Sequence, residues 1–415
     1  MDKATREEKL QRIIETEKML GEIQDVDVLL ERLLTEARAI VHADAGSIYV
    51  VEDKNLKIRY AQNDTHLAQL EPGEKLPYTS FTFPITEKSV AGYVALTGKS
   101  LNIEDAYSIP SDMPFSFNKS TDITTQYRTK SMYTLPLRVA SGRLLGVLQM
   151  INAQNEAGKV ISFDKDAELF ITHFASNATQ ALEHAYLTSN MVKRMMRMAE
   201  FRDPKETYPH VTRVAEFALE IYDRWAFNHN IPDNQRHKFR DNLKIAAKFH
   251  DVGKVGISDL ILKKPGPGRF TPDERAIMQG HTCIGANLFS DGDTELDKMS
   301  HDVALYHHER WDGGETGYPG RIDLSKYESG KALTLGEPLK GEEIPLSARI
   351  VAVADVFDAL SHKRCYKEAW NINDAFTEIQ QNAGKHFDPE IVMSFMQVRD
   401  RICAIQLAYP DAVED

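Results

Sequence analysis

The sequence predicts an α+β domain in its first half and an all-α domain in its second half, joined by one long helix. Three observations predict this arrangement. Strand-like segments alternate with helical ones up to about residue 161, a helical pattern then runs without a breaker from Ser162 to about Arg202, and beyond Glu206 one helical pattern follows another. A length of 415 residues also favours two domains of ordinary size over a single core.

The first half reads, in chain order, as helices, strands, a helix and strands. Apolar residues at helical spacing predict helices at residues 5–24 and 26–43. Two short strands, "GSIYVVED" and "LKIRYAQN", follow around a turn. In "SVAGYVALTGKSLNI", Gly98 ends a short helix ahead of a strand, and "SMYTLPLRVASGRLLGVLQMINA" gives two apolar strands joined by a Ser-Gly turn. These elements describe an antiparallel sheet with helices.

The long helix carries small and apolar residues at alternating steps of four and three, which is the heptad spacing of a coiled coil. They are Ala167, Ile171, Phe174, Ala178, Ala181, Ala185, Thr188, Val192, Met195 and Ala199. Two interpretations are open: the first half of this seam packs on the domain's own sheet, or the seam pairs with a second copy in a parallel dimer. Because the alanines would let two helices approach closely, we expect a homodimer.

The second half reads as a succession of helices. The helical segments are "HVTRVAEFALEIYDRWAFN", "DNLKIAAKFHDVGK", "TPDERAIMQGHTCIGANLF", "DKMSHDVALYHHERW", "PLSARIVAVADVFDALS" and "INDAFTEIQQNA". Residues 321–338 interrupt them, are rich in Gly, Ser and Lys, and read as a long loop.

Composition excludes several classes of protein. Charged residues make up 27% of the chain and hydrophobic residues 42%, as in soluble globular proteins. The net charge of −12 disfavours a binder of nucleic-acid polymers, although a small phosphate-bearing ligand needs only a few local cations. Three cysteines without paired spacing exclude a disulfide framework and a cysteine-rich zinc site. The N-terminus is charged and no apolar run approaches the ~18 residues of a membrane span, so we expect a cytoplasmic protein with no membrane partner.

Histidines and carboxylates recur at the ends and on the faces of the predicted helices of the second half. Asp355 interrupts the apolar segment "RIVAVADVFDAL", where an unpaired carboxylate would carry a heavy desolvation cost unless it pairs, for example with Arg349. The complete set is Glu206, His210, His250, Asp251, His281, His307, His308 and Asp355. Singly, each residue could be an ordinary cap or surface side chain. Together, imidazoles and carboxylates without thiolates suit iron, manganese or zinc, and two adjacent ions are suited to hydrolysis of a phosphate ester.

Several ordered segments of the second half resemble one known family. "FHDVGKVGISDLILKKPG", "HTCIG", "HHERWDG…GYP", "LKGEEIPLSARIVAVADVFDALSHKRCYKEAW" and "HFDPEIV" are similar to the HD-GYP domain, a branch of the HD metal-dependent phosphohydrolases, over roughly residues 200–400. The resemblance implies hydrolysis of cyclic di-GMP to pGpG or on to GMP, or of cyclic GMP-AMP. It also implies that a metal-bridging hydroxide is the nucleophile.

The resemblance assigns roles to individual residues. It places metal ligands at His210, His250, Asp251, His281, His307, His308 and Asp355, with Asp251 bridging two ions. Glu206, one helical turn before His210, matches the extra ligand of members with three ions, or is an exposed glutamate at a helix start. We therefore expect two or three iron ions, with manganese or another divalent metal as the alternative. Lys254, Arg364 and Lys367 match the cations that contact the substrate, and Tyr318 would approach its guanine base.

Two segments depart from the family pattern. The family reads Trp-Asp-Gly-x-Gly-Tyr-Pro, whereas residues 313–316 lengthen this loop here, and residues 321–338 are inserted before "LKGEEIP". Both changes leave the ligand set intact and put the Gly-Tyr-Pro contacts in doubt. The insertion is either an inert surface loop or a lid over the substrate.

The first half resembles a GAF domain, a small-ligand sensor module, through "AGSIYVVED", "SVAGYVALTGKSLNIEDAY" and "LLGVLQMIN". Within that family, "FNKSTDITTQYRTKSMYTLPL" is most similar to domains that bind cyclic nucleotides. Their dispersed Asn-Lys-Phe-Asp-Glu signature is matched here by Asn152, Phe163, Asp166 and Glu168, but Ala153 replaces the lysine. The ligand is therefore open: a cyclic mononucleotide, another small molecule, or none in a domain kept for dimerisation.

The resulting expectation is a GAF-regulated phosphodiesterase in which Asp251 and Lys254 are catalytic. We expect an N-terminal helix at residues 1–24, a GAF domain at 25–185, a linking helix at 165–203 that overlaps it, and an HD-GYP domain at 204–415. The alternatives are a catalytically silent cyclic di-GMP receptor and a phosphodiesterase for another nucleotide.

Overall fold

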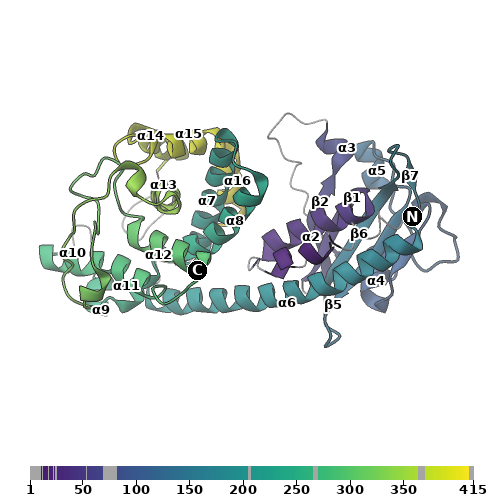
Figure 1. Ribbon diagram of the computed structural model, residues 1–415, viewed down its shortest axis with the longest axis horizontal. Helices are drawn as coiled ribbons and strands as arrows, with labels where there is room; N and C mark the ends of the chain where they lie inside the picture. The colour runs from purple at the N-terminus through teal and green to yellow at the C-terminus, as the bar shows by residue number, and fades with distance from the viewer. Residues whose placement is uncertain are drawn as a thin grey trace. The chain divides into compact units, whose positions relative to one another are not determined.

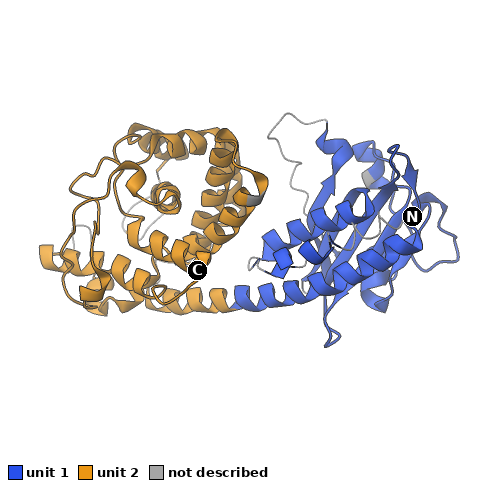
Figure 2. Ribbon diagram, in the orientation of Figure 1, with its two compact units in different colours: residues 1–190 blue, residues 191–415 orange. Residues whose placement is uncertain are grey.

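The protein was analysed as a computed structural model with two compact units, Met1–Asn190 and Met191–Asp415 (Figure 2). The structure describes residues 26–52, 54–68, 82–203, 207–264, 270–362 and 370–410, together with residues 11, 13–16, 18–21 and 23. Of the helix predicted at residues 5–24, the described residues 11, 13–16 and 18–21 are helical. Three predicted site residues, Glu206, Arg364 and Lys367, lie outside the described ranges.

Unit 1 is built on an antiparallel sheet with the strand order β3-β2-β1-β6-β5-β4, with β7 pairing beside β6 (Figure 1). The strands are β1 (Ala43–Glu52), β2 (Asn55–Asn63), β3 (Thr82–Pro84), β4 (Leu101–Ile103), β5 (Met132–Arg138), β6 (Leu144–Gln154) and β7 (Val160–Ile161). Side chains alternate between the two faces: Ile48 and Val50 belong to one apolar cluster and Tyr49 to another. The strands predicted from strand chemistry are therefore confirmed.

Helices cover both faces of this sheet. On one face, α2 (Val26–Val41) and the first half of α6 (Lys165–Arg202) share a core with β1, β5 and β6. On the other face lies α4 (Val90–Thr97), whose first turn is capped by the Ser89 hydroxyl accepting from the Gly92 N–H. Gly98 ends α4 with a φ of 71°, a conformation that glycine adopts at little cost. Short helices α3 (Asp64–Leu67) and α5 (Ser120–Thr125) complete the unit.

The heptad seam of α6 is covered by its own domain in the first half of the helix. Ile171, Phe174, Ala178 and Ala185 are each at most 1% exposed and pack in the core with α2 and the sheet. The expectation that these residues face a second copy is therefore wrong. The 4-3 spacing alone could not separate the two interpretations, because a helix lying on a sheet buries the same kind of stripe as a coiled coil.

Unit 2 contains the helices predicted from sequence and several that were missed. Its helices are α7 (Tyr208–Asn228), α8 (Asp233–Ala246), α9 (Asp259–Leu262), α10 (Pro272–Gln279), α11 (His281–Asn287), α12 (Glu295–Tyr306), α13 (Leu346–Ser361), α14 (Ile372–Gln381), α15 (Pro389–Gln397) and α16 (Arg399–Ala408). The central α7 contacts α8, α13, α15 and α16, and the core gathers fully buried side chains such as Phe217, Phe357 and Phe395. The unpredicted elements are α9, α15 and α16.

The segment predicted as one helix from Thr271 is divided into α10 and α11 at Gly280. A Cβ atom on Gly280 would lie 2.0 Å from the hydroxyl of Tyr327, which belongs to the inserted segment 321–338. Leu333 of that segment is 8% exposed, packs with Cys283 and Leu305, and donates its N–H to the Ala276 carbonyl. The insertion is therefore anchored on α10, α11 and α12.

None of the helices that the structure describes is both long enough and apolar enough to cross a membrane.

Candidate metal centre

The adjacent His250 and Asp251 lie in a tight turn between α8 and the 3-10 helix at Val252–Gly256. This turn runs very close to α11. A Cβ atom on Gly253 would lie only 1.9 Å from the carbonyl oxygen of His281, so glycine is the residue that this approach allows. The close approach brings the side chains of Asp251 and His281 together.

Asp251 stands between two groups of ligand-type side chains. Its Oδ1 is 3.0 Å from His281 Nε2 and 3.7 Å from His307 Nε2, whereas its Oδ2 is 3.4 Å from His250 Nε2. One group comprises Asp251, His281, His307 and His308, and the other comprises His210, His250 and Asp355; within each, the potential ligand atoms lie within 4.8 Å of one another. Asp355 Oδ1 joins the second group at 3.7 Å from Nε2 of both histidines.

Hydrogen bonds fix which nitrogen of each histidine faces these groups. Nδ1 of His250, His281 and His307 lies 2.8–2.9 Å from the carbonyl oxygens of Ala247, Met278 and Val303, respectively. A carbonyl can only accept, so Nδ1 carries the hydrogen in the neutral ring and Nε2 presents its lone pair. All three rings therefore offer an acceptor atom to the centre.

Acceptor atoms thus face one another across the centre. Among the described residues, no hydrogen-bond partner meets Asp251 Oδ1, His281 Nε2 or His307 Nε2, although all three atoms are buried. Burial lowers the pKa of His307, and burial together with the neighbouring His307 and His281 holds the pKa of His308 well below its usual range. Neutral imidazoles and carboxylates whose acceptor atoms converge in this way fit a divalent cation of the iron, manganese or zinc type.

Asp251 is also the partner of Lys254, whose Nζ donates to Asp251 Oδ2 at 2.6 Å. Burial alone would raise the pKa of this carboxyl, but the positive charge of Lys254 and the proximity of His250 outweigh burial and hold the pKa well below its usual range. Asp251 is therefore an anion at neutral pH, as a metal ligand must be.

The Gly-Tyr-Pro turn packs against the ligands themselves. The Tyr318 ring stacks on His308 with centroids 4.6 Å apart and meets His281 edge-on. The buried Glu309 carboxylate accepts the Gly320 N–H and so fixes the end of the turn. The lengthened part is held locally, because Asp312 pairs with Arg310 and accepts the Gly314 N–H. The longer loop therefore leaves Tyr318 beside the centre.

The structure brings together seven of the eight sequence-predicted ligands, and the eighth, Glu206, is outside the described residues. The suggestion that Asp355 pairs with Arg349 is wrong: Arg349 instead binds Asp388 at 2.6 Å. Of the predicted substrate contacts, Lys254 and Tyr318 lie at the centre, whereas Arg364 and Lys367 are outside the described ranges.

Two buried residues beside the centre were missed from sequence. Asp358, 2% exposed, accepts hydrogen bonds from His210 Nδ1 and from the Arg213 guanidinium. Each missed residue lies three positions after a predicted ligand on the same helix, Arg213 after His210 and Asp358 after Asp355. That spacing, which places side chains on one helix face, was the available signal.

Comparison with known proteins agrees with this two-unit organisation. A GAF domain family model matches residues 25–182, an HD domain model matches residues 207–360, and a second HD domain model matches residues 335–391. The chain is 35% identical over 244 residues to a "Cyclic di-GMP phosphodiesterase" of Thermotoga maritima, covering 59% of this chain and 55% of the relative. It is 35% identical over 224 residues to the "3'3'-cGAMP-specific phosphodiesterase 2" of Vibrio cholerae, covering 54% and 37%.

The chain thus spans about half the length, or less, of these curated relatives. Among solved structures, the GAF domain of an Acinetobacter phosphoenolpyruvate-protein phosphotransferase superposes with a TM-score of 0.33 at 14% identity, covering 46% of this chain and 99% of that one.

Proposed function

Residues 25–182 of this chain are a GAF domain and residues 207–360 an HD domain, and we propose that the chain is a metal-dependent phosphodiesterase that hydrolyses cyclic di-GMP to pGpG or GMP. The observation that carries this proposal is the position of Asp251, whose two carboxylate oxygens face two different groups of ligand-type side chains.

In this proposal His281, His307 and His308 would hold one ion, His210, His250 and Asp355 would hold another, and Asp251 would be a ligand available to both groups. Bound ions of this kind activate water near neutral pH and stabilise the negative charge that develops on a phosphodiester. Three imidazoles point lone pairs inward, and a carboxylate between the two groups keeps both sites anionic enough to retain divalent cations.

Lys254 and Tyr318 would position the substrate. Lys254 Nζ contacts Asp251, so its charge lies where a non-bridging phosphate oxygen would be neutralised beside the ions. Burial raises the pKa of the Tyr318 phenol, so the ring next to His308 stays uncharged and offers an apolar face and one donor to a guanine base. Arg364 and Lys367 would supply two further cations.

The substrate class rests on the relatives and on the resemblance. Relatives with 35% identity are named as phosphodiesterases for cyclic di-GMP and for 3'3'-cGAMP, and each is matched over about half of its length or less. Both compounds carry guanine and two phosphodiesters, so the alternative to cyclic di-GMP within this proposal is cyclic GMP-AMP.

We further propose iron as the working metal, with manganese as the alternative, and Glu206 as a ligand of a third ion. Glu206→Ala should spare the central pair, lower the metal content by one ion per chain and slow the step from pGpG to GMP. Unchanged stoichiometry in that variant would leave two ions as the full complement.

The GAF domain would regulate the enzyme through a small ligand, for which a cyclic mononucleotide remains one candidate. A cavity of about 480 Å³ is lined by Lys88 and by residues between 106 and 119, among them Tyr107, Phe115 and Lys119. Aromatic rings beside lysines suit a flat anionic molecule. Asn152 of the cyclic-nucleotide signature is instead 3% exposed and bonds the Lys130 N–H and the Arg128 carbonyl.

We also propose a homodimer whose contact lies on a face of α6 other than the heptad seam. Met191, Met198 and Phe201 are exposed by 62%, 70% and 83%, and their steps of seven and three place them on one side of the helix. Met198→Asp should weaken association in sedimentation velocity, because it places a charge in this stripe. A sedimentation coefficient identical to that of the parent protein would remove this face from the proposal.

The experiment that tests the function is turnover of cyclic di-GMP by the full chain purified without air, with iron and manganese measured on the same sample. We expect pGpG or GMP, two or three ions per chain, and loss of both activity and ions in Asp251→Ala. The control is Asp388→Asn, which alters a carboxylate that is 3% exposed and paired with Arg349. Tight binding without product, in protein with its ions in place, would make the chain a receptor.

A further inference from the structure

The imidazole of His210 is oriented differently from its neighbours. Nδ1 of His250, His281 and His307 bonds a backbone carbonyl three or four residues earlier in the chain, so their orientation is set locally. Nδ1 of His210 instead lies 2.8 Å from Oδ2 of Asp358, which is 148 positions away on α13. The orientation of this one ring therefore depends on tertiary packing.

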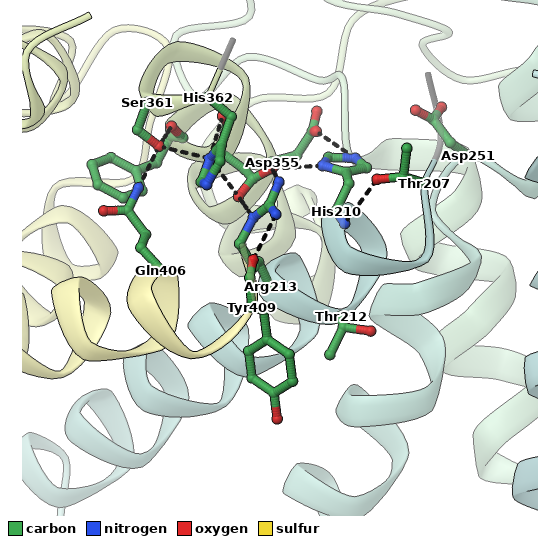
Figure 3. Close-up of polar contacts among 12 residues, drawn as sticks. Thr207, His210, Thr212, Arg213, Asp251, Asp355, Ser361, His362, Gln406 and Tyr409 are labelled. Carbon is green, nitrogen blue, oxygen red and sulfur yellow. Dashed lines mark hydrogen bonds and ion pairs between the residues drawn. The ribbon is translucent and has the colours of Figure 1, made fainter. Parts of the chain in front are cut away.

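Asp358 is held in place by a buried guanidinium. Arg213 is 1% exposed and donates from Nε to Asp358 Oδ1 at 2.7 Å and from its second terminal nitrogen to Oδ2 at 2.9 Å. This two-point contact fixes the plane of the carboxylate and balances its charge in a site without access to water. In Figure 3 the His210 and Arg213 side chains extend from the same helix, α7.

The same guanidinium connects the network to the C-terminal helix. Arg213 Nη1 donates to the Tyr409 carbonyl at 2.9 Å, just beyond the end of α16. A second tie is made by Gln406 of α16, which donates to the Ser361 hydroxyl at the end of α13 (Figure 3). The C-terminal helix is thus bonded both to the residue that holds Asp358 and to the helix that carries it.

We propose that Asp358 is a positioning residue for His210, and that Arg213 and the end of α16 hold Asp358 in place for this task. An ionised carboxylate only accepts, so its bond to Nδ1 leaves the His210 Nε2 lone pair toward Asp355 and makes the imidazole a stronger ligand. The inference rests on the metal centre of the proposed function and adds to it a residue that touches no ion.

The proposal predicts an effect limited to one group of ligands. Asp358 contacts His210 of the group that contains His250 and Asp355, whereas His281 and His307 are oriented by backbone carbonyls of their own segments. Loss of the Asp358 charge should therefore weaken ion binding by His210 and its neighbours and leave the other group unchanged.

Asp358→Asn is the informative variant because it keeps the size of the side chain. The two oxygens of Asp358 accept from His210 and twice from Arg213, and Oδ1 also lies 3.2 Å from His362 Nδ1. Asparagine has one oxygen and an NH2 that can only donate. In one orientation the NH2 opposes Arg213. In the other it faces His210 Nδ1 and favours the tautomer that carries its hydrogen on Nε2, which cannot bind an ion.

The test is titration of the full chain with Mn²⁺ alone, after removal of metal with a chelator, followed by calorimetry and metal analysis. Reference variants His210→Ala and His281→Ala identify which class of sites belongs to which group. In Asp358→Asn, we expect the class lost in His210→Ala to weaken by about 10- to 100-fold, the usual effect of removing a carboxylate behind a ligating histidine. The class lost in His281→Ala should keep its affinity.

Asp388→Asn is the matched control. Asp388 is as buried as Asp358, with 2% of its side chain exposed, and pairs with Arg349 at 2.6 Å. Unchanged affinity in both classes for folded Asp358→Asn would overturn the inference, as would equal weakening of both. Parent protein that binds no Mn²⁺ would instead overturn the metal centre itself.

A second variant covers the case in which Asp358→Asn fails to fold. Arg213→Lys keeps a positive charge beside Asp358 but cannot reproduce the two-point contact together with the bond to Tyr409. We expect the same class of sites to weaken by several-fold, and full retention of affinity would contradict the proposal.

Discussion

Replacing Asp251 with asparagine should remove the stabilisation that divalent ions give to the protein. Oδ1 of Asp251 faces His281 and His307, and Oδ2 faces His250 and Lys254. Asparagine retains one oxygen, and its NH2 must point at one of the two groups, where lone pairs already converge. At least one ion site then lacks a ligand, and the charge shared by both sites is gone.

The size of the effect follows from linkage between binding and folding. At free Mn²⁺ equal to 100 times the dissociation constant, binding stabilises the native protein by about 2.7 kcal/mol. For a unit of about 225 residues (Met191–Asp415), this raises the midpoint of thermal unfolding by roughly 5–10 °C. If the variant binds about 100-fold more weakly, the same concentration contributes about 0.4 kcal/mol and a rise of about 1 °C.

Calorimetric melts with Mn²⁺ and with a chelator measure this difference directly. Asp388→Asn is again the control and should show the full rise, because it changes a buried carboxylate away from the centre. A rise in Asp251→Asn equal to that of the parent protein would refute the argument that Asp251 is shared by two ion sites.

Three further predictions concern single side chains of unit 2. Lys254→Met should lower kcat/KM by about 10- to 100-fold, the value of one charge-assisted hydrogen bond, while metal analysis finds the ions retained. Leu333→Ala should lower the free energy of unfolding by about 2 kcal/mol in urea titrations, because Leu333 anchors the inserted segment; an unchanged midpoint would contradict this. Burial, and then the charge of Arg310, lowers the pKa of His386 to about 4. Below pH ~6.5 His386 is therefore protonated in the unfolded chain but still neutral in the folded chain, and the folded protein loses stability as the pH falls toward 4. When the pH falls from 6.5 to 4, the free energy of unfolding of His386→Gln should therefore decrease by up to about 3 kcal/mol less than that of the parent protein. Urea titrations at the two pH values measure this difference.

Much of the fold could be predicted because many of its helices and strands have clear patterns in the local sequence. Two apolar segments joined by a Ser-Gly turn predicted β5 and β6, and apolar residues at helical spacing that end at Gly98 predicted α4. The need for glycine at position 280 could not be predicted, since it comes from Tyr327, a residue 47 positions later whose hydroxyl occupies the space of a side chain there. The surface that covers the α6 seam could not be predicted either, because one apolar stripe on a helix can pack on a sheet or on a second helix.

The predicted ligands of the candidate metal centre could be identified from sequence, whereas the residues that hold those ligands in place could not. Ligand residues are chemically conspicuous in apolar helices, so His250, Asp251 and Asp355 could be picked out directly. Asp358 and Arg213 were missed because each, alone, reads as an ordinary charged residue on a helix. Their roles arise only when α7 and α13 pack together and bury the pair.

The C-terminal part of α6 contributes to the wall of the metal centre within unit 2. Met196 is 5% exposed and packs in a cluster with Val211, Ile245, Phe249 and Val252. Val211 follows the ligand His210 and Val252 follows Asp251, so one methionine side chain supports both ligand-bearing segments. The same helix contributes Phe170, Ile171 and Phe174 to the core of unit 1 and Met196 to this cluster of unit 2.

Met196→Ala should therefore affect both stability and ion binding. Truncating a buried methionine costs about 2–5 kcal/mol, and the cavity would lie against the segments of His210 and Asp251, so we expect weaker Mn²⁺ binding as well. Met393→Ala is the matched control in the same unit, because Met393 on α15 is 47% exposed and its truncation should be neutral. If the two variants unfold at the same urea concentration and bind Mn²⁺ alike, Met196 of α6 does not support the centre.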